Sequence, residues 1–297
     1  MADAALPPLD RRSALAEAWA EADWAVRLAL LLALALTVAA AAAPWLAPFD
    51  PDAQSLLARL RPPLGFDRAL PAHPLGTDEL GRDILSRCLH ALRLSMALAA
   101  AGAALGMLIG GTLGLIAGLG GRFADAAIMG LVDIQIAVPF TLIALLAVAV
   151  FGSDLTVLVA VLGVAYWEQY ARVVRGEVLR LREAPFIEGA RAAGASPWRI
   201  AVRHMGPNLV SPLAVMFTLN FSNIVLLEST LSFLGLGVQP PTATLGAMVG
   251  HGRAYMTSAP WVVAVPALLI LVATLTVQLL GDWLRDRADV RLRRRDR

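Results

Sequence analysis

The stretch EGARAAGASPWRIAVRHMGPN, residues 188–208, is a polar, arginine-bearing segment in a chain that is otherwise largely apolar. Of the 297 residues, 58% are hydrophobic and 16% are charged, and the mean hydropathy is +0.67. Soluble domains contain only about 45–50% apolar residues, even with glycine counted. The composition therefore predicts an integral membrane protein, in which residues 188–208 are an exception that needs a reason.

The exceptional stretch predicts two short helices separated by a fixed turn. Pro185 suits the first position of the first helix, and Gly194 suits the left-handed residue that follows its end. Ser196 is a good N-cap for the second helix, with Pro197 at its first position and Pro207 closing the unit. An ordered helix–glycine–helix unit is thus expected here.

Each predicted helix has a distinct face. The second helix carries an apolar stripe at helical spacing, formed by Trp198, Ala201, Val202 and Met205. The first helix carries small and apolar residues beside one acid and one arginine; these are Phe186, Ile187, Ala190 and Ala193, with Glu188 and Arg191. A helix lying on anionic lipid would explain the arginines, but neither the acid nor the turn. A docking surface for a partner protein is the favoured interpretation.

Six apolar stretches are long enough to cross about 30 Å of hydrocarbon. They lie at 26–46, 94–118, 126–150, 154–171, 209–233 and 260–282. The fold class is therefore all-α integral membrane with six transmembrane helices. The first stretch also resembles a signal peptide, although the leader before it is long and holds Glu17, Glu21 and Asp23.

Arginine placement sets the expected orientation, because short cytoplasmic segments are rich in basic residues. With the N-terminus inside, 18 arginines lie inside and seven outside. This predicts a cytoplasmic tail at 1–25, an external loop at 47–93, a core of five helices at 94–284 with a cytoplasmic loop at 172–208, and a basic cytoplasmic tail at 285–297. Inserting the seven arginines at 172–203 would cost about 2.5–3.5 kcal/mol each at mid-bilayer, so residues 172–208 are expected to lie outside the membrane.

Glycines and polar residues mark positions of interest within the spans. Glycines recur every four residues from Gly102 to Gly118, which predicts close packing against more than one neighbour. Pro139 should kink the third span. Polar side chains inside spans usually face the protein interior; the candidates are Asp133, Gln135, Asn220, Asn223, Glu228 and Gln278. Interhelical hydrogen bonding, contact with a transported solute and a proton relay all remain open for them.

Several chemistries are excluded by what the sequence lacks. All 25 basic residues are arginine, so neither a P-loop nor a Schiff-base lysine can exist here. Cys88 is the single cysteine, and the four histidines are not at metal-ligand spacing. We therefore expect no catalytic residue, no metal site and no cofactor bound by this chain, and no nucleic-acid partner.

Residues 188–208 resemble the EAA loop of binding-protein-dependent ABC importer permeases, in particular the dipeptide/oligopeptide/nickel subfamily. HPLGTDELGRDILSR, residues 73–87, LLESTLSFLGLGVQPP, residues 226–241, and the last apolar stretch also look like that subfamily. The resemblance covers about residues 70–290 and is closest to the second of the two permease subunits. The matching loop residues are Glu188, Ala190, Gly194, Ile200, His204, Pro207 and Asn208, while Gly189 and Gly206 depart from the usual pattern. In the external motif, the matching residues are Gly76, Thr77, Asp78, Gly81, Arg82 and Asp83.

The resemblance implies a type I ABC importer permease fold in a bacterial cytoplasmic (inner) membrane, multi-pass, with both termini cytoplasmic. It implies a heterodimer with a homologous permease subunit, two ABC ATPase subunits that hold ATP-Mg, and an external solute-binding protein. The cargo would be di/oligopeptides or a related small solute. An autonomous secondary transporter using Glu228 or Asp133 is the main alternative, and a membrane enzyme is a weaker one.

Overall fold

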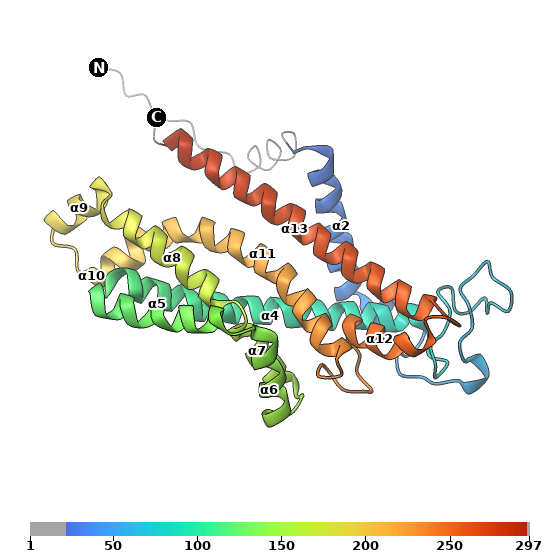
Figure 1. The fold of residues 1–297 in the computed structure, drawn as a ribbon. Helices are drawn as coiled ribbons and strands as arrows, with labels where there is room; N and C mark the ends of the chain where they lie inside the picture. Colours follow the sequence, from blue (N-terminus) through green and yellow to red (C-terminus); the bar gives the residue numbers. More distant parts are fainter. Residues whose placement is uncertain (1–21, 296–297) are drawn as a thin grey trace, which may run out of the picture.

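The computed structural model describes the backbone of residues 22–295 and the side chains of residues 22–287. Residues 1–21 of the predicted N-terminal tail and residues 296–297 of the predicted basic tail lie outside the described residues. The described chain is built from helices and loops, with one isolated antiparallel bridge between Thr77 and Asp83. Figure 1 shows the arrangement.

The helices follow one another along the chain with short connections, apart from the loops before α4 and α12. The longer ones are α2 (Trp24–Ala41), α4 (Ile84–Leu119), α5 (Gly121–Ala137), α6 (Phe140–Phe151), α7 (Leu155–Val164), α8 (Trp167–Arg182), α9 (Pro185–Ala192), α11 (Gly206–Phe233), α12 (Leu245–Gly252) and α13 (Trp261–Arg295). The short ones are α3 (Ala43–Leu46), η1 (Leu56–Ala58), α10 (Pro197–Arg199), the π-helical η2 (Ile200–Met205) and η3 (Arg253–Tyr255).

Five helical stretches in the described residues are long and apolar enough to cross a membrane. They are Trp24–Ala41, Ile84–Leu119, Leu155–Arg182, Pro197–Phe233 and Trp261–Arg287. A sixth span results if α5 and α6 together form one broken span. The predicted all-α membrane fold is confirmed, and its six spans correspond to these five stretches and the broken pair.

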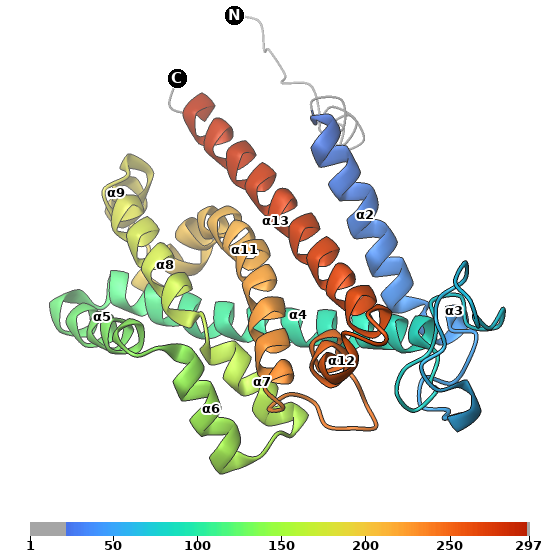
Figure 2. The same ribbon diagram turned by 45° about the vertical axis from the view of Figure 1, so that its right-hand side comes forward.

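The third predicted span is broken rather than kinked. α5 and α6 meet at 88° across Val138 and Pro139. Pro139 has no N–H to donate, and its ring pushes Val138 into an extended conformation, with φ −105° and ψ 130°. As a result, α6 and α7 project together from the side of the helical body (Figures 1 and 2).

Four spans extend further than predicted, namely Ile84–Leu119, Leu155–Arg182, Pro197–Phe233 and Trp261–Arg287. α4 begins at Ile84, where Asp83 accepts a hydrogen bond from the Ser86 N–H, and it runs unbroken to Leu119. Its 36 residues are about 54 Å long. The helix predicted near the outer surface is therefore the first part of α4. At the other end of the chain, α13 continues to Arg295 through the predicted basic tail.

The glycine stripe of α4 packs on α7 and then on α8. A Cβ at Gly102 would lie 2.9 Å from the Leu162 Cβ on α7, and one at Gly110 would lie 2.1 Å from the Trp167 carbonyl on α8. One at Gly118 would lie 2.5 Å from the Val178 side chain. The predicted close packing against more than one neighbour is confirmed, because the partner changes from α7 to α8 as the stripe winds.

The outer helices α2 and α13 pack together and against α4. Leu36 and Ala40 of α2 lie in a buried cluster with Ile84 and Cys88 of α4 and Val262 of α13. The hairpin, defined here as α9, α10 and η2, lies at one end of the molecule, and the loop before α4 lies at the other (Figures 1 and 2). The two segments with the most distinctive sequences are thus far apart.

Candidate functional site

The first helix of the hairpin ends as the sequence predicts. α9 begins with Pro185 in its first turn, and Gly194 has φ +77°. The Gly194 N–H donates to the Arg191 carbonyl at 2.9 Å, and the Ala195 N–H donates to the Ala190 carbonyl at 3.0 Å. This pair of bonds is a Schellman motif, which fixes the direction in which the chain leaves the helix.

The second helix starts as predicted but does not stop at Pro207. Ser196 accepts from the Arg199 N–H at 3.3 Å, and Pro197 stands in the first turn. The chain then passes through the π-helical η2 directly into α11, and the Gly206 N–H donates five residues back to the Ala201 carbonyl. Because Pro207 cannot donate to the residue four before it, a wider turn lets the helix continue past it.

The hairpin is held to the body by its inner face. Ile187, Ile200 and Met205 are buried in a cluster with side chains of α8 and α11, namely Val174, Val178, Leu181 and Leu209. The predicted stripe is half wrong, because Trp198 is 75% exposed and Val202 is 52% exposed. The sequence pattern assumed 3.6 residues per turn, whereas the π turn changes which residues share the inward face.

The outer face of the hairpin is uncovered and mixed in character. Trp198 and Phe186 are exposed beside Glu188 and Arg191, which are also exposed. Large exposed aromatic side chains on a rigid element are typical of protein interfaces. The spacing predicted that Trp198 and Met205 share one helix face, but the structure exposes Trp198 and buries Met205.

The predicted loop residues divide between the two faces. Glu188, Gly189, Gly194 and Pro207 are exposed, whereas Ile200 is buried and Ala190 is half-buried. His204 and Asn208 brace the π turn: the His204 ring nitrogen Nδ1 lies 3.3 Å from the Arg199 carbonyl, and the Asn208 amide donates to the His204 carbonyl at 2.7 Å. The sequence therefore predicted the hairpin, and the structure separates its anchors from its exposed surface.

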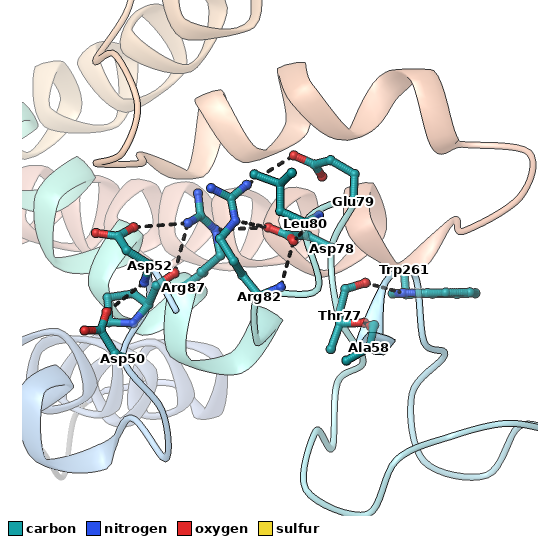
Figure 3. A network of polar contacts seen from close by, with 11 residues as sticks. Asp50, Asp52, Ala58, Thr77, Asp78, Glu79, Leu80, Arg82, Arg87 and Trp261 are labelled. Atoms are coloured by element: carbon teal, nitrogen blue, oxygen red, sulfur yellow. Dashed lines mark hydrogen bonds and ion pairs between the residues drawn. The ribbon is translucent and has the colours of Figure 1, made fainter. Parts of the chain in front are cut away.

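The external motif forms a buried knot, defined here as residues 76–83. Thr77, Asp78, Arg82 and Asp83 are all buried. The Arg82 guanidinium donates to the Asp78 carboxylate at 2.6 Å and to Glu79 at 3.1 Å, and the Arg87 Nε lies 3.5 Å from Asp78 (Figure 3). Buried charges need such compensation, so removing one partner would leave an unpaired buried charge and destabilise the fold.

The knot also ties three parts of the chain together. The Thr77 hydroxyl donates to the Ala58 carbonyl and accepts from the Arg61 N–H, while the Trp261 indole donates to the Thr77 carbonyl at 3.2 Å (Figure 3). Gly81 has φ +72°, and a Cβ there would lie 1.8 Å from the Ser55 carbonyl oxygen. Gly76 likewise has φ +82° and lies against Arg61. The starts of α4 and α13 are thereby fixed to the loop.

The polar residues of the spans have different surroundings. Glu228 is fully buried and accepts from the Ser232 hydroxyl at 2.6 Å, and Thr244, the N-cap of α12, donates to the same hydroxyl at 3.2 Å. Asn220 is fully buried and Asn223 half-buried. Asp133 was expected to face inward, but its carboxylate is exposed and pairs with Arg172 of α8 at 2.8 Å. An arginine partner outside the core satisfies it there.

Gln135 connects the two helix breaks, a role that the sequence did not reveal. Its amide donates to the Val164 carbonyl at 2.8 Å and to the Glu168 carboxylate at 3.0 Å, and its carbonyl accepts from the Trp167 indole. Val164 is the last residue of α7, so its carbonyl has no helical partner. The end of α5 is thus joined to the junction of α7 and α8.

Comparison with known proteins identifies the relatives of this chain. Residues 110–294 match the family described as binding-protein-dependent transport system inner membrane component. The di/tripeptide transport system permease protein DppC of Pseudomonas aeruginosa is 39% identical over 84% of this chain and 83% of its own length. The glutathione permease GsiD of Pectobacterium atrosepticum is 42% identical over 75% and 74%, and the nickel permease NikC of Escherichia coli K12 is 37% identical over 91% and 95%.

A solved structure shares the fold. The inward-facing MetNI methionine ABC transporter contains a chain with a TM-score of 0.54 and 20% identity, aligned over 68% of this chain and 96% of that chain. At this level of identity the likeness concerns the fold alone. The family match and the relatives, which are similar over most of their length, therefore place this chain in the binding-protein-dependent transport family, as a membrane-spanning permease subunit of an ABC importer with the type I importer fold.

Proposed function

We propose that this permease forms half of a translocation pore with a homologous permease subunit, and that the hairpin is its docking surface for an ATPase subunit. The observation that carries this proposal is the hairpin itself. Its inner face is anchored by Ile187, Ile200 and Met205, and its outer face presents Phe186 and Trp198 to solvent. A rigid element with exposed aromatics can transmit a displacement from a partner to α8 and α11.

The anchoring gives the coupling a physical route. η2 runs without interruption into α11, and Ile187 of α9 packs on Val178 and Leu181 of α8. A movement of the hairpin therefore has to move the inner ends of these two helices, because packed side chains transmit displacement. This chain would bind no nucleotide, and ATP-Mg would be held by the two partner ATPase subunits.

The cargo would be a di- or oligopeptide or a related small solute, delivered by an external solute-binding protein. The relatives carry different cargo names, namely di/tripeptide, glutathione and nickel. The autonomous secondary transporter is not favoured, because the family is binding-protein-dependent.

The docking proposal is tested by reversing one exposed charge. In membranes that contain all partner subunits, Glu188→Arg should retain normal abundance but retain fewer ATPase subunits on purification and lose solute uptake. Asp286 is an exposed acid on α13, so Asp286→Arg is the matched charge-reversal control. This variant should retain the ATPase subunits and solute uptake. Normal uptake by Glu188→Arg at normal abundance would reject the docking role, and proton-driven uptake by the chain alone would support the secondary transporter.

Orientation is tested with single thiols. In a Cys88→Ala background, a membrane-impermeant maleimide should label Ser153→Cys from outside, and should label Ala192→Cys only after permeabilisation. Ala192 is exposed at the end of α9, and it is a better site than Ser196 because Ser196 caps the second helix. Both termini would then lie in the cytoplasm. The reverse labelling pattern would overturn this orientation.

A further inference from the structure

A cavity of about 300 Å³ lies at the outer end of α4, between two loops. Its walls are residues 51–52 of the first loop and residues 242–243 of the loop before α12. Its floor is one face of α4, formed by Arg87, His90, Arg93, Leu94 and Ala97. Residues spaced three and four apart share a helix face, so these side chains converge on the same space. The external motif and the hairpin do not account for this cavity.

The charges around the cavity are only partly compensated. Arg87 is buried and donates to the Pro51 carbonyl at 3.0 Å and to the Asp52 carboxylate at 3.3 Å, and its Nε lies 3.5 Å from Asp78 (Figure 3). Asp52, the acid in the cavity wall, is therefore already paired. Arg93 is exposed and makes no hydrogen bond or ion pair with any described residue. Among the charged residues that line the cavity, Arg93 is thus the one without an ion pair to a described residue.

His90 adds a second polar group. Its Nδ1 lies 3.0 Å from the Ser86 carbonyl, which can only accept, so Nδ1 carries the hydrogen and Nε2 remains for a ligand. The rest of the surface is apolar or small, with Leu94 and Ala97 on the floor and Ala243 in the wall. A volume of this size is at the lower end of the range for small-molecule sites, which combine apolar walls with a few convergent polar groups.

We propose that this cavity is a binding site for a small solute that carries a carboxylate, with Arg93 as the carboxylate ligand and the α4 floor against its apolar body. The planar guanidinium matches a carboxylate through two parallel hydrogen bonds. A bare divalent cation is disfavoured by the same unpaired charge. The proposal rests on the proposed function in one respect, which is that the solute is cargo on its way into the pore.

Charged thiol reagents test the electrostatics without any need for transport. In the purified full importer with Cys88→Ala, a thiol at Ala97→Cys should react faster with a sulfonate-bearing methanethiosulfonate than with a trimethylammonium one. The ratio of the two rates should fall roughly tenfold in Arg93→Gln, because residues four apart on a helix are about 6 Å from each other and a unit charge at that distance in water acts oppositely on the two reagents. Arg59→Gln, an exposed arginine outside the cavity, should leave the ratio unchanged.

Protection identifies the ligand class. N-acetylalanine should slow labelling of the same thiol, whereas N-acetylalaninamide should not, and Arg93→Gln should abolish the protection. Thr242→Cys in the opposite wall repeats the measurement if Ala97→Cys is poorly assembled. Equal protection by the acid and the amide, protection by neither, or a rate ratio unchanged in Arg93→Gln would overturn the site.

Uptake by the complete importer then separates the two proposals. If Arg93 binds cargo, Arg93→Gln should raise the KM for uptake of a carboxylate-bearing solute, with membrane abundance and ATPase retention unchanged. Failure of ATP-driven uptake in the unmodified importer, with acid-specific protection intact, would reject the proposed function and leave the site standing. Uptake that is normal in Arg93→Gln, with protection lost, would reject the cargo role of the site.

Discussion

The knot and the hairpin are both short polar segments with glycines at positive φ, yet their polar groups are satisfied in opposite ways. In the knot, Asp78 and Arg82 are buried and bind one another. In the hairpin, Glu188 and Arg191 are exposed, and the segment is anchored by apolar side chains. The buried charges of the knot are paired within this chain, whereas the outer face of the hairpin is uncovered.

The glycines of the two regions express the same difference. Gly81 and Gly194 have similar φ values, +72° and +77°. A Cβ at Gly81 would meet the Ser55 backbone at 1.8 Å, whereas nothing lies within 4 Å of a Cβ at Gly194. Substitution in the knot should therefore affect folding, and substitution in the hairpin should affect coupling with less effect on folding.

The largest effect on stability is expected for Gly81→Ala. Its Cβ overlaps backbone, which cannot move aside as a side chain can, so we expect a loss of more than about 3 kcal/mol and little protein in the membrane. Gly65→Ala is the matched control, because Gly65 also has a positive φ, +98°, but open space around it. The control should lose only about 1–2 kcal/mol. Abundance and thermal unfolding of both variants measure this, and equal losses would contradict the overlap.

The next largest effect is expected for Ile187→Ala at the hairpin anchor. Ile187 is fully buried, and replacing a buried isoleucine with alanine costs about 2–5 kcal/mol. The neighbouring Phe186→Ala, which is half exposed, should cost far less. Because Ile187→Ala leaves a void at the base of the hairpin, proteolysis of residues 183–208 should be faster in Ile187→Ala and unchanged in Phe186→Ala. Equal rates of proteolysis in the two variants would show that the hairpin does not depend on this anchor.

A smaller stability effect with a large functional one is expected for Gly194→Val. A Cβ in the left-handed region costs about 1–2 kcal/mol, and a β-branched residue fits it worse. The chain should still insert, but the turn between α9 and α10 should change, so ATP-driven uptake should collapse. Gly189→Ala, on the exposed side of α9 with open space around it, should retain uptake. Normal uptake by Gly194→Val at normal abundance would mean that the turn geometry is not needed.

The smallest stability effect is expected for Trp198→Ala. Its side chain is mostly exposed, so the change should shift unfolding by no more than about 0.5 kcal/mol. If the outer face docks an ATPase subunit, the same change should weaken that association by about 2 kcal/mol, as for an aromatic hot spot. A titration of ATPase subunits onto the purified permease measures the difference. An unchanged affinity would exclude Trp198 from the interface.

Local sequence patterns predicted a large part of this structure. Pro185, Gly194, Ser196 and Pro197 fixed the ends of the hairpin helices, because capping depends on residues within one turn. The apolar stretches predicted the spans for a similar reason, since a helix must satisfy its own backbone in lipid. The glycines from Gly102 to Gly118 predicted a closely approached neighbour, although not which one it is.

Other features could not be read from local pattern. Pro139 and Pro207 both interrupt the helical hydrogen bonding, yet the chain turns by 88° at the first and continues through a π turn at the second. At the first, Gln135 joins the end of α5 to α7 and α8; at the second, the buried Met205 lies in one apolar cluster with Val178 of α8. These outcomes depend on contacts with residues distant in the sequence.

The sequence by itself determined that this is a helical membrane protein, and it determined where the hairpin begins and turns, because composition and capping are local properties. Its resemblance to a known family indicated the ABC importer permease. Tertiary structure alone decided that residues 76–83 are a buried knot, that Trp198 faces outward and that Asp133 pairs with Arg172. It also decided that Arg93 stands unpaired beside a cavity, among the described residues. Burial and charge compensation are set by which distant segments pack together, and no local pattern records that.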